Sequence, residues 1–207
     1  MGSWVVTWLR GWLNTIDPKN LIQVMLAEGK NVNKVVTSET KILAEGAIFV
    51  ALSVILKDVL PPIYQLPQGG SVSAAGMVPL LWFSLRRGLR SGLEASVVYG
   101  LVHMALPGSY VVDPVQGLLD YPIAFAALGL AGMFRKYPLL GVGVGIFGRF
   151  LAHLVSGVWF FSAYAPAGTH PVVYSAIYNG GFLIVEFIIS AIIIYAIVKR
   201  RLLDIYL

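Results

Sequence analysis

Six stretches of predominantly apolar residues follow one another along the chain, separated by short polar or turn-rich segments. A membrane-spanning α-helix needs about 20 such residues. The pattern therefore predicts an all-α, polytopic membrane protein with six transmembrane helices. The predicted spans are residues 42–60, 71–85, 91–106, 114–134, 138–162 and 172–198, of which the second and third are the shortest.

Lys and Arg residues occupy alternate loops of this pattern. They lie before the first predicted span and after the second, fourth and sixth, whereas loops 61–70, 107–113 and 163–171 contain none. Loops rich in Lys and Arg stay on the cytoplasmic side of a membrane. Both termini are therefore expected in the cytoplasm, which agrees with an even number of spans.

The N-terminal segment, residues 1–40, differs from the predicted membrane domain, residues 41–207. Trp4, Trp8 and Trp12 recur every four residues, which indicates a short helix with one aromatic face. Such a helix is too short to span a bilayer. The segment is therefore predicted to form an interfacial, amphipathic helical extension, with docking to a partner as the alternative.

The composition agrees with a membrane protein, since 57% of the residues are hydrophobic, 12% are charged and the mean hydropathy is +0.78. The net charge of +5 comes from loop residues, so it indicates membrane topology and not a nucleic-acid surface. No Cys and only three His are present, too few for thiolate chemistry or a metal cluster. Walker A, H-E-x-x-H and G-x-S-x-G motifs are missing from the sequence. We therefore expect a protein that is not an enzyme and has no cofactor or metal of its own.

Three polar residues lie at similar depth inside the predicted spans. With a rise of about 1.5 Å per residue, Asp120 lies roughly 9 Å, His153 roughly 13 Å and Asn179 roughly 10 Å below the outer ends of their helices. A charge near the bilayer centre costs at least about 2.5 to 3.5 kcal/mol, so it is retained only for pairing or function. The convergence of the three residues predicts a solute pocket that opens outward.

Aromatic residues crowd the same region. One explanation is the belt of aromatic side chains that forms at membrane interfaces. An acid among aromatic rings is also the set expected around a flat cationic heteroaromatic ligand, held by stacking and cation–π attraction, although a neutral flat ligand stays open. The residues concerned are Tyr110, Tyr121, Phe125, Trp159, Phe160, Phe161, Tyr164, Tyr174 and Tyr178.

Two opposite charges lie deeper in the predicted spans. Arg149 and Glu186 both fall roughly 20 Å below the outer ends of adjacent helices. Opposite charges at equal depth can neutralise each other, so we predict that they form a structural pair. A proton relay through Glu186, Arg149 and His153 is the functional alternative.

Six short segments within residues 41–200 resemble the thiamin-specific S-component of energy-coupling-factor transporters. The segments are residues 66–71 (LPQGGS), 86–88 (RRG), 118–122 (LLDYP), 153–157 (HLVSG), 164–168 (YAPAG) and 174–179 (YSAIYN). The resemblance implies a substrate-binding subunit of the bacterial cytoplasmic membrane that captures thiamin from outside with high affinity.

The resemblance also implies a set of ligand-binding residues. In this sequence they are Tyr110, Asp120, Tyr121, His153, Gly157, Phe161, Tyr174 and Asn179. Asp120 meets the charge of the ligand and stands where many members of the family have the longer Glu. Phe161 stands where some members have a stacking Trp, so stacking is expected either to be weaker or to be supplied elsewhere, for example by Trp159 or Tyr64.

The partners that the resemblance implies are a membrane coupling subunit and two ATP-binding-cassette ATPases, which alone use ATP. Ala47 and Ala51 form an A-x-x-x-A step in the first span, which suits packing within the chain or contact with the coupling subunit. Two other hypotheses stay open. One is an S-component for a thiamin precursor or another flat vitamin, and the other is an integral-membrane enzyme or scaffold.

Overall fold

The computed structural model describes residues 18–202, so the predicted aromatic helix with Trp4, Trp8 and Trp12 lies outside the described part of the chain. The chain divides into two units, Met1–Leu43 and Ala44–Leu207. Helix α2 (Pro18–Val54) contributes to both units. The predicted first span is thus the end of a longer helix.

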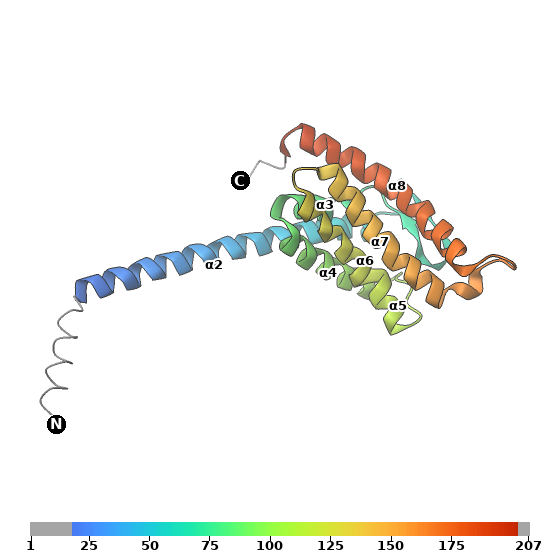
Figure 1. Ribbon diagram of the computed structural model, residues 1–207, viewed down its shortest axis with the longest axis horizontal. Helices are drawn as coiled ribbons and strands as arrows, with labels where there is room; N and C mark the ends of the chain where they lie inside the picture. Colours follow the sequence, from blue (N-terminus) through green and yellow to red (C-terminus); the bar gives the residue numbers. More distant parts are fainter. Residues whose placement is uncertain (1–17, 203–207) are drawn as a thin grey trace, which may run out of the picture. The chain divides into compact units, whose positions relative to one another are not determined.

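The unit Ala44–Leu207 is built of helices and one small sheet (Figure 1). After α2 come the π-helical turn η1 (Ile55–Val59), strand β1 (Tyr64–Gln65), the 3-10 turn η2 (Pro67–Gly69) and strand β2 (Ser71–Val72). The strands pair antiparallel, with Tyr64 opposite Val72 and Gln65 opposite Ser71. The helices that follow are α3 (Val78–Arg87), α4 (Leu89–Ala105), α5 (Pro114–Leu118), η3 (Leu119–Ile123), α6 (Ala124–Ala126), η4 (Ala127–Phe134), α7 (Pro138–Phe160), η5 (Ser162–Tyr164) and α8 (Pro171–Lys199).

The segment α5–η3–α6–η4 forms one continuous helical rod at the centre of this unit. It packs against α4 and α7, and its η4 part also packs against α3. Phe125, Leu128 and Ala131 of this rod are fully buried. Pro122 has no N–H to donate, so the helix widens into a π-helical turn around it.

The predicted helical character is confirmed for most of the described chain, with the two-stranded sheet as the exception. Three helical segments of the described chain are long and apolar enough to cross a membrane, namely Pro114–Phe134, Pro138–Phe160 and Pro171–Lys199. These segments are the predicted fourth, fifth and sixth spans. The predicted second span is wrong at its start, because residues 71–72 form a strand and α3 begins only at Val78.

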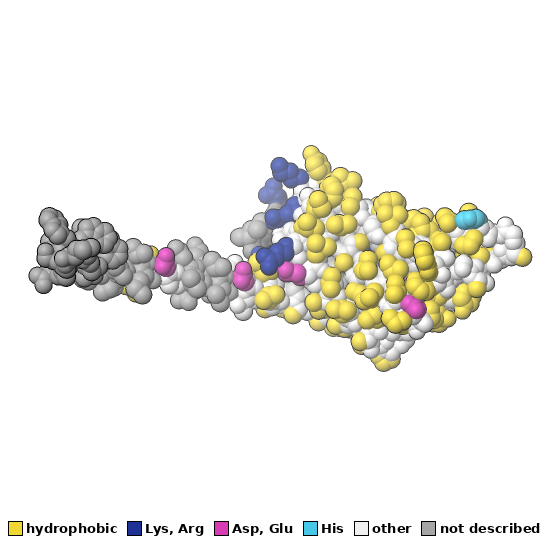
Figure 2. All heavy atoms as spheres, turned by 60° about the horizontal axis from the view of Figure 1, so that its bottom comes forward, with side chains coloured by type: hydrophobic (Ala, Val, Ile, Leu, Met, Phe, Trp, Pro, Cys, Tyr) yellow, Lys and Arg dark blue, Asp and Glu magenta, His cyan; other side chains and the backbone are white. Residues whose placement is uncertain are grey.

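Helices α7 and α8 lie side by side (Figure 1). Both expose large apolar side chains. Phe147, Ile184 and Ile192 are all more than half exposed. Figure 2 shows hydrophobic side chains over much of one face of the protein. An apolar surface of this kind is stable against lipid, whereas soluble monomers rarely expose large contiguous patches.

Helix α4 crosses η3 at very short range because Gly100 has no side chain. A Cβ atom there would lie 2.6 Å from the Cα of Pro122 and 2.8 Å from the carbonyl oxygen of Tyr121. Both are backbone atoms that cannot swing aside. The glycine therefore sets the distance between these two elements.

We predict that Gly100→Ala destabilises the protein by about 1 to 3 kcal/mol through overpacking. The matched control is Gly181→Ala in α8, where a Cβ would meet nothing within 4 Å. It should be neutral or slightly stabilising, because Ala favours helix over Gly by about 1 kcal/mol. Thermal unfolding of the detergent-solubilised variants measures both, and equal midpoints would contradict the close crossing.

Candidate ligand-binding site

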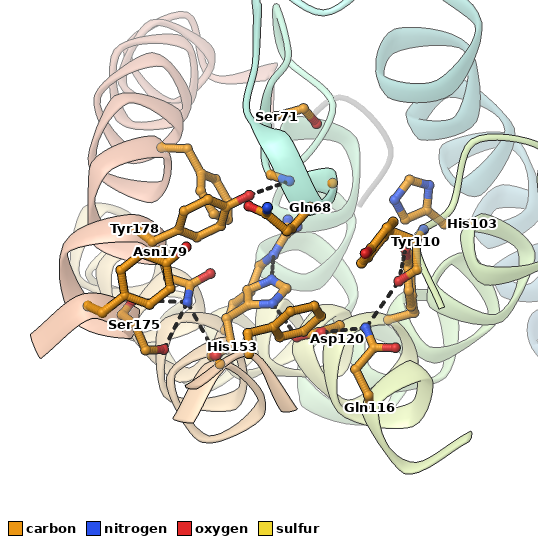
Figure 3. A pocket seen from close by; sticks show the side chains of 18 of the residues that line it. Gln68, Ser71, His103, Tyr110, Gln116, Asp120, His153, Ser175, Tyr178 and Asn179 are labelled. Atoms are coloured by element: carbon orange, nitrogen blue, oxygen red, sulfur yellow. Dashed lines mark hydrogen bonds and ion pairs between the residues drawn. The ribbon is translucent and has the colours of Figure 1, made fainter. Parts of the chain in front are cut away.

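A polar cavity lies within the unit Ala44–Leu207, between α4, the α5–η3 segment, α7, α8 and the stretch 68–71 (Figure 3). All eight residues predicted to bind the ligand line this cavity. They are Tyr110, Asp120, Tyr121, His153, Gly157, Phe161, Tyr174 and Asn179. The structure thus brings them together at one site, while their contact with a ligand stays a prediction.

Asp120 is held by three side-chain donors. Its Oδ1 lies 2.8 Å from Nδ1 of His153, and its Oδ2 accepts hydrogen bonds of 2.7 Å from both Ser156 and Gln116. The π-helical turn around Pro122 contains Asp120. Charge-assisted hydrogen bonds are stronger than neutral ones, so this acid is fixed in one orientation.

Gln116 links Asp120 to the loop that carries Tyr110. Its amide nitrogen donates to Asp120 and to the carbonyl of Tyr110, and its amide oxygen accepts from the N–H of Val112 at 3.0 Å. The side chain is almost fully buried. Gln116 was not among the residues predicted to form the site, although its position four residues before Asp120 places both on one helix face.

Arg149 closes the other side of the Asp120–His153 pair. Its Nε donates to Nε2 of His153 at 3.1 Å, and its guanidinium lies 4.0 Å from the ring centre of Phe125. Both nitrogens of His153 are therefore engaged. Cation–π contact with Phe125 compensates part of the cost of burying the guanidinium.

Glu186 forms its close ion pair with Lys57, whereas no ion pair or hydrogen bond joins it to the predicted partner Arg149 within the described residues, and these two charges attract each other only at longer range. Oε1 of Glu186 lies 3.8 Å from Nζ of Lys57 and accepts hydrogen bonds from the N–H and hydroxyl of Ser73 at 2.7 and 2.8 Å. Arg149 turns instead toward His153 and Phe125. Equal depth on adjacent helices does not fix how each helix is rotated, which decides the partner.

Five buried charged groups surround the cavity, and only three of them line it. Asp120 lines the cavity together with Lys57 and Arg149. Asp58 and Glu186, with side chains 8 and 1% exposed, lie behind the lining beside His103 and Lys57, respectively. Asp120 is therefore the carboxylate of this group that a ligand in the cavity can reach, and it offers a cation an opposite charge.

Asn179 lies on the α8 side of the cavity. Its amide nitrogen donates to the carbonyl oxygens of Ser175 and His153 and to the hydroxyl of Ser175. These bonds leave its amide oxygen as an acceptor. Gly157 permits the close approach of α7 here, because a Cβ would collide with the side chain of Ser175.

The aromatic walls differ from those expected. Neither Trp159, which is 79% exposed, nor Tyr64, which is 61% exposed, lines the cavity. Tyr178 and Phe182 do, one and two helical turns beyond Tyr174. The prediction that Trp159 or Tyr64 supplies stacking is therefore wrong. Phe161 does line the cavity, and its ring centre lies 6.0 Å from that of Tyr110.

Tyr178 also ties α8 to the stretch 67–70. Its hydroxyl donates to the carbonyl of Pro67 and accepts from the N–H of Gly70. On the opposite side, the hydroxyl of Tyr121 accepts from the N–H of Tyr110 at 2.6 Å. Contact with the hydroxyl of Tyr164 raises the pKa of Tyr110, so this loop side chain stays protonated at neutral pH.

Ala47 and Ala51 lie on an exposed face of α2, in the part of that helix that belongs to the unit Ala44–Leu207. Ile48, Leu52 and Ile55 beside them are also exposed. The strip is therefore available to lipid or to another membrane protein. Packing within residues 18–202 does not use it.

The helical fold, the apolar surface and the buried polar cavity define a membrane protein built around a site for a small solute. The family described as "Thiamine transporter protein (Thia_YuaJ)" matches residues 43–204, and the chain belongs to this family. Its relatives are named as transporters, so the chain is a transport protein and not an enzyme.

Similar proteins include two curated transporters and one solved structure. "Thiamine transporter ThiT" of Bacillus subtilis (strain 168) is 39% identical over 168 residues, covering 73% of this chain and 87% of that protein. "Thiamine transporter ThiT" of Lacticaseibacillus paracasei is 32% identical over 176 residues, covering 74% and 84%. ThiT from Listeria monocytogenes has a similar structure, with a TM-score of 0.71, 27% identity, and coverage of 79% of this chain and 96% of that chain.

We predict that Glu186→Ala destabilises the protein by about 3 to 5 kcal/mol, because it leaves Lys57 buried without its partner. The control is Glu94→Ala, which removes an exposed pair with Arg90 and should cost under about 1 kcal/mol. Thermal unfolding in detergent compares the two. Similar midpoints for both variants would show that Glu186 has no structural role.

Proposed function

We propose that this chain is the high-affinity thiamin-binding subunit of an ATP-driven vitamin importer. The observation that carries the proposal is the carboxylate of Asp120, which lines the cavity together with aromatic side chains. Thiamin joins a thiazolium cation to an aminopyrimidine ring, so it offers one positive charge and two flat rings. The names of the relatives point to the same ligand.

Asp120 is the acid that we assign to the positive charge of thiamin. Glu186 has a basic partner in Lys57, and neither Glu186 nor Asp58 lines the cavity. Asp120 accepts only from neutral donors and His153, and it lines the cavity itself. A cation bound beside it balances the buried charge, which is costly in a low-dielectric site.

Aromatic side chains and amides complete the proposed site. Tyr110 and Phe161 lie close enough to form one aromatic wall, and Tyr174 lies near Tyr178 on α8. Flat rings bind between such walls by stacking and cation–π attraction. The free amide oxygen of Asn179 accepts a hydrogen bond from the amino group of the pyrimidine in this proposal.

The proposed topology has six membrane crossings, with both termini in the cytoplasm of a bacterial cell. Figure 2 shows Lys and Arg side chains gathered at one end of the unit Ala44–Leu207. Among the basic residues of this unit, Arg87 donates to Glu45 at 2.7 Å, and Arg86 lies 3.1 Å from the same carboxylate. A basic end of this kind faces the cytoplasm according to the positive-inside rule. The loops without Lys and Arg then face outward, and ligand enters from that side.

The proposed partners are a membrane coupling subunit and two ATP-binding-cassette ATPases. The sequence has no Walker A motif, so ATP is used by the partners alone and this chain needs no cofactor. The exposed strip with Ala47 and Ala51 is the proposed contact with the coupling subunit. Small residues allow helices to approach closely in membranes.

The first experiment is calorimetric titration of the detergent-purified full chain with thiamin, riboflavin, biotin and the isolated hydroxymethylpyrimidine. Submicromolar binding of thiamin alone is expected. Tighter binding of the neutral pyrimidine would favour a precursor transporter. Binding of none of them would overturn the assignment of a vitamin ligand.

We predict that Asp120→Asn weakens thiamin binding by about 2 kcal/mol or more, roughly thirtyfold, because the cation loses its opposite charge. Glu94→Gln removes an equal charge from an exposed position outside the cavity and should leave the dissociation constant unchanged. Calorimetry in detergent measures both constants. An unchanged affinity of Asp120→Asn would remove this acid from the site.

We predict that Ala47→Trp and Ala51→Trp block thiamin uptake by cells that express the complete transporter, yet leave binding to the purified chain intact. A bulky ring prevents close helix contact at the strip. Leu151→Trp, on the exposed face of α7, is the matched control and should leave both properties unchanged. Normal uptake by both alanine variants would argue against this docking face.

A further inference from the structure

Two pairs of a carboxylate and an imidazole lie at the cavity, and the ligand contacts proposed above involve only one of them. The first pair is Asp120 with His153. The second is Asp58 of η1 with His103 of α4, whose Nδ1 lies 2.5 Å from Oδ1 of Asp58. His103 lines the cavity, and Figure 3 shows it on the side opposite Tyr178 and Asn179.

The ring of His103 is held on several sides. Tyr99 stacks on it with a centroid distance of 5.7 Å and an interplanar angle of 12°, and Phe125 contacts it edge-on at 5.4 Å. The hydroxyl of Tyr99 donates to Oδ2 of Asp58 at 3.0 Å. Tyr99 and Phe125 are fully buried, so the acid and the imidazole have little freedom to move.

The two imidazoles differ in whether a ring nitrogen remains without a hydrogen bond from the described chain. Arg149 donates to Nε2 of His153, so that ring has no unused nitrogen. Within the described chain, no side chain or backbone group hydrogen-bonds Nε2 of His103, and its side chain is 22% exposed at the cavity. A carboxylate beside Nδ1 fixes the proton on that nitrogen, which leaves Nε2 as an acceptor.

We propose that His103 is a ligand-binding residue whose Nε2 accepts a hydrogen bond from an N–H or O–H group of the ligand. Asp58, held by Tyr99, is the positioning residue that fixes the proton on Nδ1. The inference rests on the proposed function, since thiamin carries a primary amine and a hydroxyl group. His103 then selects ligands that present a donor on this side of the cavity.

A purely structural His103 would be expected to use both of its nitrogens within the protein, as His153 does. Lys57 and Ser71, which also line the cavity, bond to each other and not to His103. A group with an unused acceptor in a cavity is a site of selectivity, because a ligand without the matching donor leaves that acceptor unpaired.

The test compares His103→Asn with His103→Gln in the full chain by calorimetry with thiamin. Asn places its amide near the position of Nδ1, whereas Gln places it near Nε2. Asn is expected to weaken binding about tenfold, and Gln to recover most of that loss. His170→Gln, at the N-terminus of α8 and outside the cavity, is the control and should bind as the wild type does.

Two thiamin analogues separate a contact from a structural role. One has hydrogen in place of the pyrimidine amine, and the other has ethyl in place of hydroxyethyl. His103→Asn should weaken thiamin binding but leave the affinity for one of the analogues unchanged, because that analogue lacks the donor. An equal loss for all three ligands, or no loss for any, would overturn the proposal.

The wild-type chain provides a readout that needs no folded variant. In protein labelled with [¹⁵N]histidine, the resonance of the unprotonated Nε2 of His103 should move upfield when thiamin binds, as expected for an acceptor. A resonance that does not move would overturn the proposal. Failure of the wild type to bind thiamin would instead contradict the proposed function itself, so the two failures are distinguishable.

Discussion

The cost of burying charge inside a membrane governs the arrangement of this protein. Three carboxylates and two basic side chains lie around one cavity, and each needs partners that water cannot supply there. Glu186 obtains them from Lys57 and Ser73, which ties α8 to residues far away in sequence. The bundle is therefore held together at its polar centre as well as by apolar packing, and Asp120 is the carboxylate that lines the cavity.

The sequence predicted the helices best where apolar runs were long. The predicted spans 114–134, 138–162 and 172–198 agree closely with the observed segments. The start of the second span could not be predicted, because the backbone at Ser73 is held by a distant residue. The N–H and the hydroxyl of Ser73 donate to Glu186, which lies more than a hundred residues later in the sequence. A local hydrophobic pattern carries no information about such a distant acceptor.

The depth of the site residues along their helices could be predicted from the sequence, but the rotation of each helix about its axis could not. Asp120, His153 and Asn179 were placed together because helical rise converts sequence position into depth. Helix rotation decides which neighbour each side chain faces, and it turned Arg149 away from Glu186. The same limit hid Lys57 and His103, whose roles depend on partners across the cavity.

Gln116 couples one wall of the cavity to its acid. Its amide joins the carboxylate of Asp120 to the backbone of Tyr110 and Val112, using both of its ends at once. The carboxylate and the loop that carries Tyr110 are therefore joined by directional bonds through one side chain. A shift of Asp120 cannot occur without straining or breaking these bonds, so the position of the acid and the shape of this wall of the cavity depend on each other.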